Sequence, residues 1–258
     1  MEFACGQCIG CRVARSQSWA IRCMHESQMH KESSFVTLTY ENAPLSLDYR
    51  DFQMFLKRLR KARGPVRYFA AGEYGDKLSR PHFHALLFGV GWPDKKKHSK
   101  TLFKSEELQK LWKHGFGSIG DVTFQSAGYV ARYALKKITG ERAKEHYMQV
   151  DVDTGELAKI SAEMAHMSLK PGIGYSWFEK FWKDTCLARD GVVVNGKEFK
   201  LPRYYDALLE KISIDMSTGK EFDRWIKSQK YSADNTPERL AVREIVEKAR
   251  LAQMKRSL

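Results

Sequence analysis

The stretch RPHFHALLF at residues 80–88 decides the fold of this chain and indicates its chemistry. On a β-strand, side chains two positions apart project from the same face, so His82 and His84 would point together and Phe83 to the opposite face. Paired imidazoles on a rigid strand are well suited to holding a divalent metal ion. A strand end that merely carries two histidines is the alternative for so short a motif. The stretch therefore predicts a strand with a candidate metal site on one face.

The residues just before this stretch predict its partner strand. Residues 66–73 form a β-prone segment, and Gly-Asp-Lys at 75–77 would turn the chain back as a hairpin. Glu73, nine residues before His82, would then lie across from the two histidines. Two imidazoles and one carboxylate suit Mn²⁺ well, and Mg²⁺ when a phosphodiester adds oxygen ligands. We expect Glu73, His82 and His84 to bind Mg²⁺ or Mn²⁺.

Periodicity along the chain predicts an α+β fold, in which helices pack on one antiparallel sheet. The strand predicted at residues 35–40 is expected to be central in the sheet and to carry no chemistry of its own. The predicted helices cover residues 13–30, 52–63, 105–114 and 126–137, and a further strand covers residues 117–124.

The chain divides into two predicted parts. Residues 1–140 would form the core, with an N-terminal cysteine cluster and helix. Residues 141–258 would form an extension packed on this core, with a polar excursion at 141–165. The segment NTPE at 235–238 would begin a final basic helix.

Two tyrosines are the second candidate for chemistry. Tyr129 and Tyr133 stand four positions apart in a predicted helix and would share one face. A phenol has a pKa of about 10, so a tyrosine nucleophile needs positive charge or a metal ion nearby. Arg132 and Lys136, each three residues after a tyrosine, would supply that charge. The alternative is an aromatic pair in the core, which is common at helical spacing.

The cysteines gather near the start of the chain. Cys5, Cys8 and Cys11 are spaced closely enough for zinc or an iron cluster, and Cys23 or His25 would complete the ligand set. Disulfides are not expected in a chain without an export signal. The predicted metal is a structural Zn²⁺, and reduced, partly buried thiols are the slightly favoured alternative.

The charge of the chain predicts a polyanionic partner. It has 44 Lys and Arg against 31 Asp and Glu, a net charge of +13, which favours nucleic acid. No apolar run is long enough for a bilayer, and no signal peptide is predicted, so we expect no membrane partner and a cytoplasmic location. The residues expected to contact DNA phosphates are Lys57, Arg58, Arg60, Lys61, Lys95, Lys96, Lys97 and Lys137.

In order and spacing these motifs resemble those of the HUH endonucleases, which include the rolling-circle replication initiators. The resemblance rests on FVTLT at 35–39, GEYG at 72–75, RPHFH at 80–84 and Tyr-x-x-x-Tyr-x-x-Lys from Tyr129. The two-tyrosine form is similar to the initiators of small single-stranded DNA phages, and most similar to the gokushovirus branch of the microviruses. Further segments that resemble this group are CGQCIGCR at 5–12, GDVTF at 120–124, KPGIG at 170–174 and NTPER at 235–239.

The resemblance implies a metal-dependent enzyme with an HUH endonuclease fold, built on an RRM-like antiparallel sheet. A tyrosine, with Tyr129 favoured for the first cut, would attack single-stranded or origin DNA and leave a 5′-phosphotyrosine and a free 3′-OH. The second tyrosine would support rejoining, which closes circular phage genomes in rolling-circle replication. The implied partners are a host helicase and polymerase in the host bacterial cytoplasm.

Two other functions remain open. A relaxase or transposase of the same chemical class would use the same motifs on plasmid or element DNA. A basic module that holds single-stranded nucleic acid without cutting it would need no metal and would leave the strand intact.

Overall fold

The computed structural model describes residues 5–75, 78–133, 137–138, 140–151 and 154–253 of the chain. Its centre is a seven-stranded sheet with the order β4-β5-β6-β1-β3-β2-β9, in which every paired neighbour is antiparallel. The strands are β1 Ser33–Thr39, β2 Arg67–Tyr74, β3 Pro81–Phe88, β4 Lys96–Lys97, β5 Phe103–Lys104, β6 Gly117–Asp121 and β9 Met164–Met167. The predicted α+β class is confirmed.

The core of this sheet has the RRM-like topology that the sequence predicts. Helix α2 (Tyr49–Arg63) connects β1 to β2, and α3 (Glu106–Leu111) lies between β3 and β6. The four strands are ordered β6-β1-β3-β2, so β3 lies between the two strands that α2 connects. This is the split βαβ arrangement, and it is compatible with an HUH-type fold.

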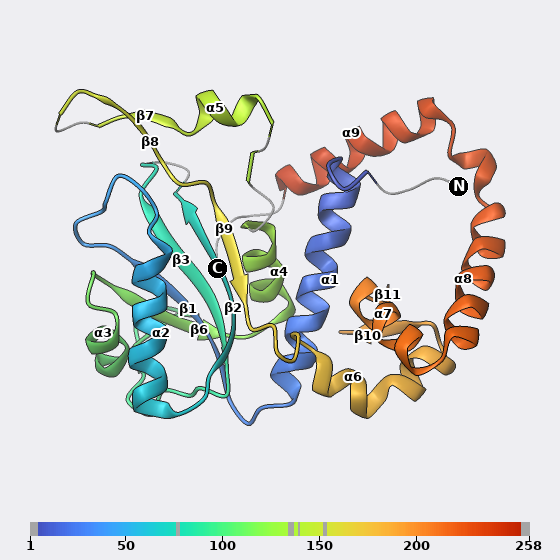
Figure 1. Ribbon diagram of the computed structural model, residues 1–258, viewed down its shortest axis with the longest axis horizontal. Coiled ribbons are helices and arrows are strands. Elements are labelled where there is room, and N and C mark those ends of the chain that lie inside the picture. Colours follow the sequence, from blue (N-terminus) through green and yellow to red (C-terminus); the bar gives the residue numbers. More distant parts are fainter. Residues whose placement is uncertain (1–4, 76–77, 134–136, 139, 152–153, 254–258) are drawn as a thin grey trace.

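The two faces of the sheet pack against different helices. Side chains alternate along each strand, so Phe83, Ala85 and Leu87 of β3 lie in one core with α2 and α3. Leu86 and Phe88 lie in the other core with α1 (Ile9–Gln28) and α4 (Phe124–Tyr133). Figure 1 shows α2 on one side of the sheet, with α4 and then α1 on the other. The histidines of β3 alternate with the first set and therefore lie on the α4 side.

Helix α1 also packs against a third core, formed by the C-terminal part of the chain. Its Ile21 is buried with residues of α6, β10, β11 and α7. Figure 1 shows α1 between the sheet and these elements, with α8 and α9 arching back towards the start of α1. The elements are α6 Tyr175–Trp182, a π-helix Lys183–Leu187, β10 Gly191–Val194, β11 Lys197–Lys200, α7 Arg203–Ile212, α8 Ile214–Gln229, a 3-10 helix Ser232–Asp234 and α9 Pro237–Gln253.

The glycine-rich loop at 170–174 joins two of these cores. The Gly174 N–H donates to Glu26 Oε2 at 2.7 Å, and Glu26 Oε1 accepts from Arg67 Nε at 2.5 Å. Gly174 has a φ of +83°, and a Cβ there would lie 2.4 Å from the Tyr205 hydroxyl. The glycine is therefore required by a positive φ and by close packing.

The main difference from prediction lies in residues 141–165. This segment contains α5 (Arg142–His146) and the hairpin of β7 (Met148–Val150) and β8 (Leu157–Lys159), and its end begins β9. Strand β9 pairs with β2 through Phe69↔Met167, so this part of the chain completes the sheet of the other. The division at residue 140 stays a prediction, although the sheet crosses it. Within the described residues, no helix is both long and apolar enough to cross a membrane.

Candidate active site

The β2–β3 hairpin brings Glu73 and the two histidines together, as the sequence predicts. Its register pairs Glu73 with His82 and Ala71 with His84, so the carboxylate lies beside both imidazoles. Glu73 Oε1 is 3.0 Å from His82 Nε2 and 3.2 Å from His84 Nε2. One ligand atom from each of the three residues lies within 4.8 Å of the others. The three side chains form a candidate metal site.

Each imidazole is held from behind by a hydrogen bond at Nδ1. His82 Nδ1 is 3.1 Å from the Arg80 carbonyl oxygen, and His84 Nδ1 is 3.0 Å from Thr37 Oγ1. A carbonyl oxygen only accepts, so His82 Nδ1 carries a proton. Metal-binding histidines characteristically make such a bond through the nitrogen that faces away from the ion.

The donor set therefore fits a divalent cation. A neutral His82 that donates through Nδ1 presents a lone pair at Nε2, directed at a carboxylate oxygen. Two lone pairs at 3.0 Å repel unless a proton or a metal ion lies between them. Two imidazole nitrogens and a carboxylate oxygen leave further positions open for oxygen ligands of Mn²⁺ or Mg²⁺.

The site is dry on one side and accessible on the other. Glu73 and His84 are buried, whereas His82 is partly exposed. Burial raises the pKa of Glu73, but the hydrogen bonds from His82 and His84 outweigh it and lower the pKa to about 2. The carboxylate is therefore ionised at neutral pH, as a metal ligand must be.

Helix α4 places Tyr129 beside this site. The Tyr129 ring meets the His84 ring edge-on, with centroids 5.0 Å apart and planes at 81°. It also meets the Phe35 ring of β1 edge-on, at a centroid distance of 6.3 Å. The tyrosine is partly buried, so it belongs to both the α4 core and the rim of the site.

The packing of α4 explains why Tyr129 reaches the site. Ser126 and Thr123 exchange hydrogen bonds at the start of the helix, where the Thr123 N–H donates to Ser126 Oγ at 2.8 Å. Further along, Gly128 allows α1 to approach closely, since a Cβ there would lie 3.9 Å from Ala20 Cβ. Ser16 of α1 also donates to the Gly128 carbonyl at 3.3 Å.

The other residues predicted around the tyrosines are placed in part. Tyr133 is the last residue of α4, four positions after Tyr129 and on the same helix face by backbone geometry. Its side chain and the whole of Lys136 lie outside the described residues. Arg132 is exposed on α4, and Lys137 is exposed just beyond it.

The other predicted DNA-binding residues lie away from the site. Helix α2 covers the opposite face of the sheet, so its basic run does not flank the histidines. Arg58 Nε instead donates to the Leu111 carbonyl at 2.7 Å, and Arg60 Nη2 to the Val66 carbonyl at 3.0 Å. Lys57 and Lys61 of the same run are exposed. The exposed residues Lys95, Lys96 and Lys97 lie in or beside β4, at the far edge of the sheet.

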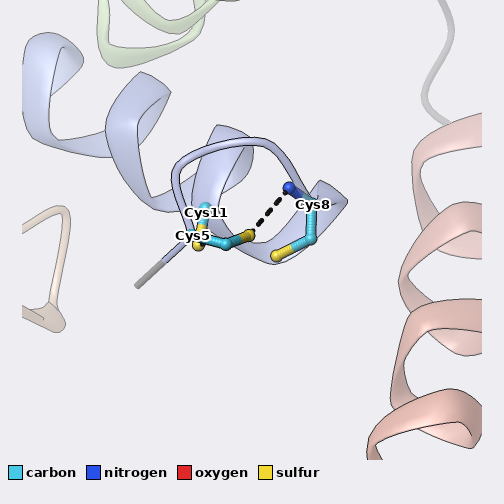
Figure 2. Close-up of side chains that lie close together, drawn as sticks. All are labelled: Cys5, Cys8 and Cys11. Carbon is cyan, nitrogen blue, oxygen red and sulfur yellow. Dashed lines mark hydrogen bonds between the residues drawn. The ribbon is translucent and has the colours of Figure 1, made fainter. Parts of the chain in front are cut away.

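The structure brings together three of the four cysteines predicted to share a metal. Cys5, Cys8 and Cys11 lie together at the start of α1, as Figure 2 shows. Cys23 does not join them: it is fully buried in the core shared with α4, and 12 residues of helix, about 18 Å, separate it from Cys11. His25 is excluded as well, because its Nδ1 is 2.9 Å from the Tyr205 hydroxyl and its ring stacks on Trp177.

The role of Thr37 is missed by sequence reasoning. The strand at 35–40 is predicted to carry no chemistry, yet Thr37 lies directly across from His84 in the β1–β3 register and orients its ring. The available signal is the alternation of FVTLT, which places Thr37 on the same sheet face as the histidines once the register is known.

Comparisons with known proteins define the class. The family model for replication-associated proteins of the ORF2 type matches residues 33–138, which contain β1, the metal site and α4. The chain is 37% identical over 226 residues to Replication-associated protein VP4 of Bdellovibrio phage phiMH2K, covering 81% of this chain and 68% of that protein. No solved structure matches the chain.

Two further relatives carry the same description. Replication-associated protein ORF4 of Chlamydia phage 1 is 30% identical over 238 residues, covering 85% of this chain and 55% of that protein. Replication-associated protein ORF2 of Spiroplasma virus 4 is 30% identical over 230 residues, covering 80% of this chain and 67% of that protein. The chain thus spans between about half and two-thirds of its relatives' length. It belongs to the family of phage replication-associated proteins.

Proposed function

We propose that this chain is a replication initiator that nicks single-stranded or origin DNA through Tyr129, with Mg²⁺ or Mn²⁺ held by Glu73, His82 and His84. The observation that carries the proposal is the edge-on contact of Tyr129 with His84, whose centroids are 5.0 Å apart. It puts a phenol next to a two-histidine, one-carboxylate site, which is the pairing that metal-assisted phosphodiester cleavage by tyrosine requires.

In the proposed reaction the Tyr129 hydroxyl loses its proton and its oxygen bonds to the phosphorus of the scissile phosphate. The bond from that phosphorus to the 3′ oxygen breaks, and the 3′ oxygen gains a proton and leaves as a 3′-OH. A bound Mg²⁺ or Mn²⁺ supplies a Lewis acid that polarises the phosphate oxygens. Thr37 and Arg80, through its carbonyl, keep the two imidazoles in position, and Phe35 packs against the tyrosine.

Rejoining follows from the same chemistry. The 5′-phosphotyrosine conserves the phosphodiester bond, so attack by a 3′-OH restores the DNA strand and frees the tyrosine without ATP. In this proposal Tyr133 makes the second cut, and the released 3′-OH closes a circular phage genome in rolling-circle replication. Arg132, Lys136 and Lys137 contact phosphates near the site. Unwinding and synthesis fall to a host helicase and polymerase in the host bacterial cytoplasm.

The test is the formation of a covalent adduct between protein and DNA. Overlapping single-stranded oligonucleotides that tile the genome encoding this chain are incubated with the full chain and Mn²⁺, then separated on a denaturing gel. We expect one oligonucleotide to yield a shifted band that Tyr129→Phe reduces at least tenfold. Tyr231→Phe, a change at a tyrosine 66% exposed near the far end of the chain, is the matched control. An undiminished adduct in the Tyr129→Phe, Tyr133→Phe double variant would refute the tyrosine assignment.

The metal assignment has its own test in the same assay. His82→Ala is expected to abolish the adduct, whereas His98→Ala, at an exposed histidine, should leave it unchanged. Cleavage that survives His82→Ala contradicts the metal site. Tight binding without any cleavage favours the non-catalytic module, and transfer of element ends rather than origin-dependent synthesis favours a relaxase or transposase.

A further inference from the structure

The start of α1 carries a cluster of three thiols that the proposed DNA chemistry does not use. Cys5 Sγ and Cys11 Sγ are 3.9 Å apart, and the three sulfurs lie within 4.8 Å of one another. Figure 2 shows the loop of residues 5–8 folding back so that the Cys5 side chain lies over the first turn of the helix. Gly6 permits this fold with a φ of +74°. Sulfurs from three separate residues thus share one small volume.

The spacing of these sulfurs matches a single tetrahedral ion. A Zn–S bond of about 2.3 Å places two sulfurs of a tetrahedron about 3.8 Å apart. The Cys5–Cys11 distance of 3.9 Å agrees with this edge. A disulfide would require about 2.05 Å between sulfurs. In an iron–sulfur cubane each thiolate binds a different iron, so its sulfurs stand farther apart than those of one ion.

The electrostatic surroundings favour thiolates. The first turn of α1 contains no acidic residue, and its N-terminal end carries the positive pole of the helix dipole. The Cys8 N–H donates to Cys5 Sγ at 3.3 Å. Backbone hydrogen bonds from Cys8 and Gln7 lower the pKa of Cys5 to about 7. Arg12 and Arg15 follow in the next turn and add positive charge.

We propose that Cys5, Cys8 and Cys11 bind one Zn²⁺ through their three sulfurs, with water at the fourth position. Soft thiolate ligands select Zn²⁺ over Mg²⁺ and Mn²⁺, so this site and the histidine site take different metals. Binding exchanges the remaining thiol protons for the metal ion and leaves the complex with one net negative charge at the helix N-terminus. The ion links the loop of residues 5–8 to α1, which α9 also contacts.

The experiment is a cobalt titration of the full chain after reduction and metal removal. Co²⁺ in a thiolate site gives strong sulfur-to-metal charge-transfer absorption, which a histidine–carboxylate site does not give. We expect this absorption to saturate at one Co²⁺ per chain and to disappear when Zn²⁺ is added. Cys8→Ser and Cys11→Ser should each abolish it, whereas Cys23→Ala and Cys186→Ala, at the two buried cysteines, should retain it.

Three results would overturn the proposal. One is the absence of charge-transfer absorption in the reduced chain, and another is its persistence in Cys8→Ser. The third is purified protein in which these cysteines hold iron and sulfide or form a disulfide. Circular dichroism of each variant confirms that it is folded. The readout does not involve DNA, so failure here leaves the nicking proposal untouched, and failure of nicking leaves this site untouched.

Discussion

At the scale of single residues, the orientation of His84 depends on a hydroxyl from the neighbouring strand. Thr37 Oγ1 is 3.0 Å from His84 Nδ1, on the side of the ring away from Glu73. A hydrogen bond at this position holds the imidazole plane so that Nε2 faces the ion, and outer partners of this kind typically contribute 10–100-fold to metal affinity. Thr37 is therefore a positioning residue.

The first prediction follows from this contact. Thr37→Val keeps the β-branched shape but removes the hydroxyl, so we expect Mn²⁺ affinity to fall about 10–100-fold, with folding unchanged. Isothermal titration with Mn²⁺ measures the loss. Thr39→Val is the matched control, because Thr39 lies on the same strand and donates to the Phe116 carbonyl instead. Equal affinity in wild type and Thr37→Val would contradict the positioning role.

The metal ligands themselves are predictable from sequence because strand alternation and a short hairpin determine their neighbours. Glu73 and His82 need only one turn between them to meet. Thr37 and Tyr129 come from elements whose register and packing depend on the whole sheet, so local patterns do not place them. The same holds for Cys23, whose spacing resembles that of a ligand although the helix carries it into the core.

At the scale of elements, α1 is held against α6 and α7 by a buried histidine. His25 stacks on Trp177 with ring centroids 3.4 Å apart, and its Nδ1 is 2.9 Å from the Tyr205 hydroxyl. Burial lowers the pKa of His25 to about 3, so the ring is neutral in the folded protein. The charged neighbours on its own helix are Arg22 and Glu26.

The second prediction is a loss of stability in mild acid. An unfolded histidine has a pKa of about 6.5, so below that pH the unfolded chain binds a proton that folded His25 does not. The free energy of unfolding should fall from pH 6.5 downwards, by up to about 1.4 kcal/mol per pH unit. The hydrogen bonds that offset burial at Glu26 lower its pKa to about 2, so Glu26 contributes only below about pH 4.5.

Urea unfolding between pH 6.5 and 4.5 measures this slope. His25→Gln should reduce it, while His98→Gln, at an exposed histidine, should not. Burial also lowers the pKa of His166, which accounts for a residual slope in the same direction. A slope that is identical in His25→Gln and wild type would refute the assignment.

Elements with strong local signals are predicted well, and those that depend on a partner are not. The apolar stripe of α2 and the alternation of β3 identify both elements. Strand β9 consists of only MAHM and forms because the edge of β2 is available. Charge patterns likewise reveal that α2 is basic, but the connection from β1 to β2 decides which face it covers, and this separates Lys57 and Lys61 from the site.

At the scale of the whole molecule, α1 joins cores that would otherwise be separate. Ala20 and Cys23 pack with the sheet and α4, whereas Ile21 packs with α6 and α7. Arg22 lies between the Trp19 and Tyr204 rings, 4.1 and 4.0 Å from their centroids. A helix whose opposite sides are both buried couples the stability of the two halves.

The third prediction is that the two halves unfold together. Hydrogen exchange of peptides from β3 and α7 should give the same midpoint in urea. Ile21→Ala, which removes a buried side chain, should cost about 2–5 kcal/mol and shift both midpoints equally. Ile214→Ala, at a side chain 69% exposed, should change stability by no more than about 0.5 kcal/mol. Separate midpoints for β3 and α7 would show that α1 does not couple them.

The position of α1 also constrains biosynthesis. Within the described chain α1 is translated first, yet the residues that cover its second side lie in α6 and α7, near the opposite end of the sequence. At about 5–20 residues per second, the nascent helix waits on the order of ten seconds or more for that cover. Until then its apolar side is open to the ribosome surface and to chaperones, so slower growth at reduced temperature, with abundant chaperone, is the condition most favourable for producing folded protein.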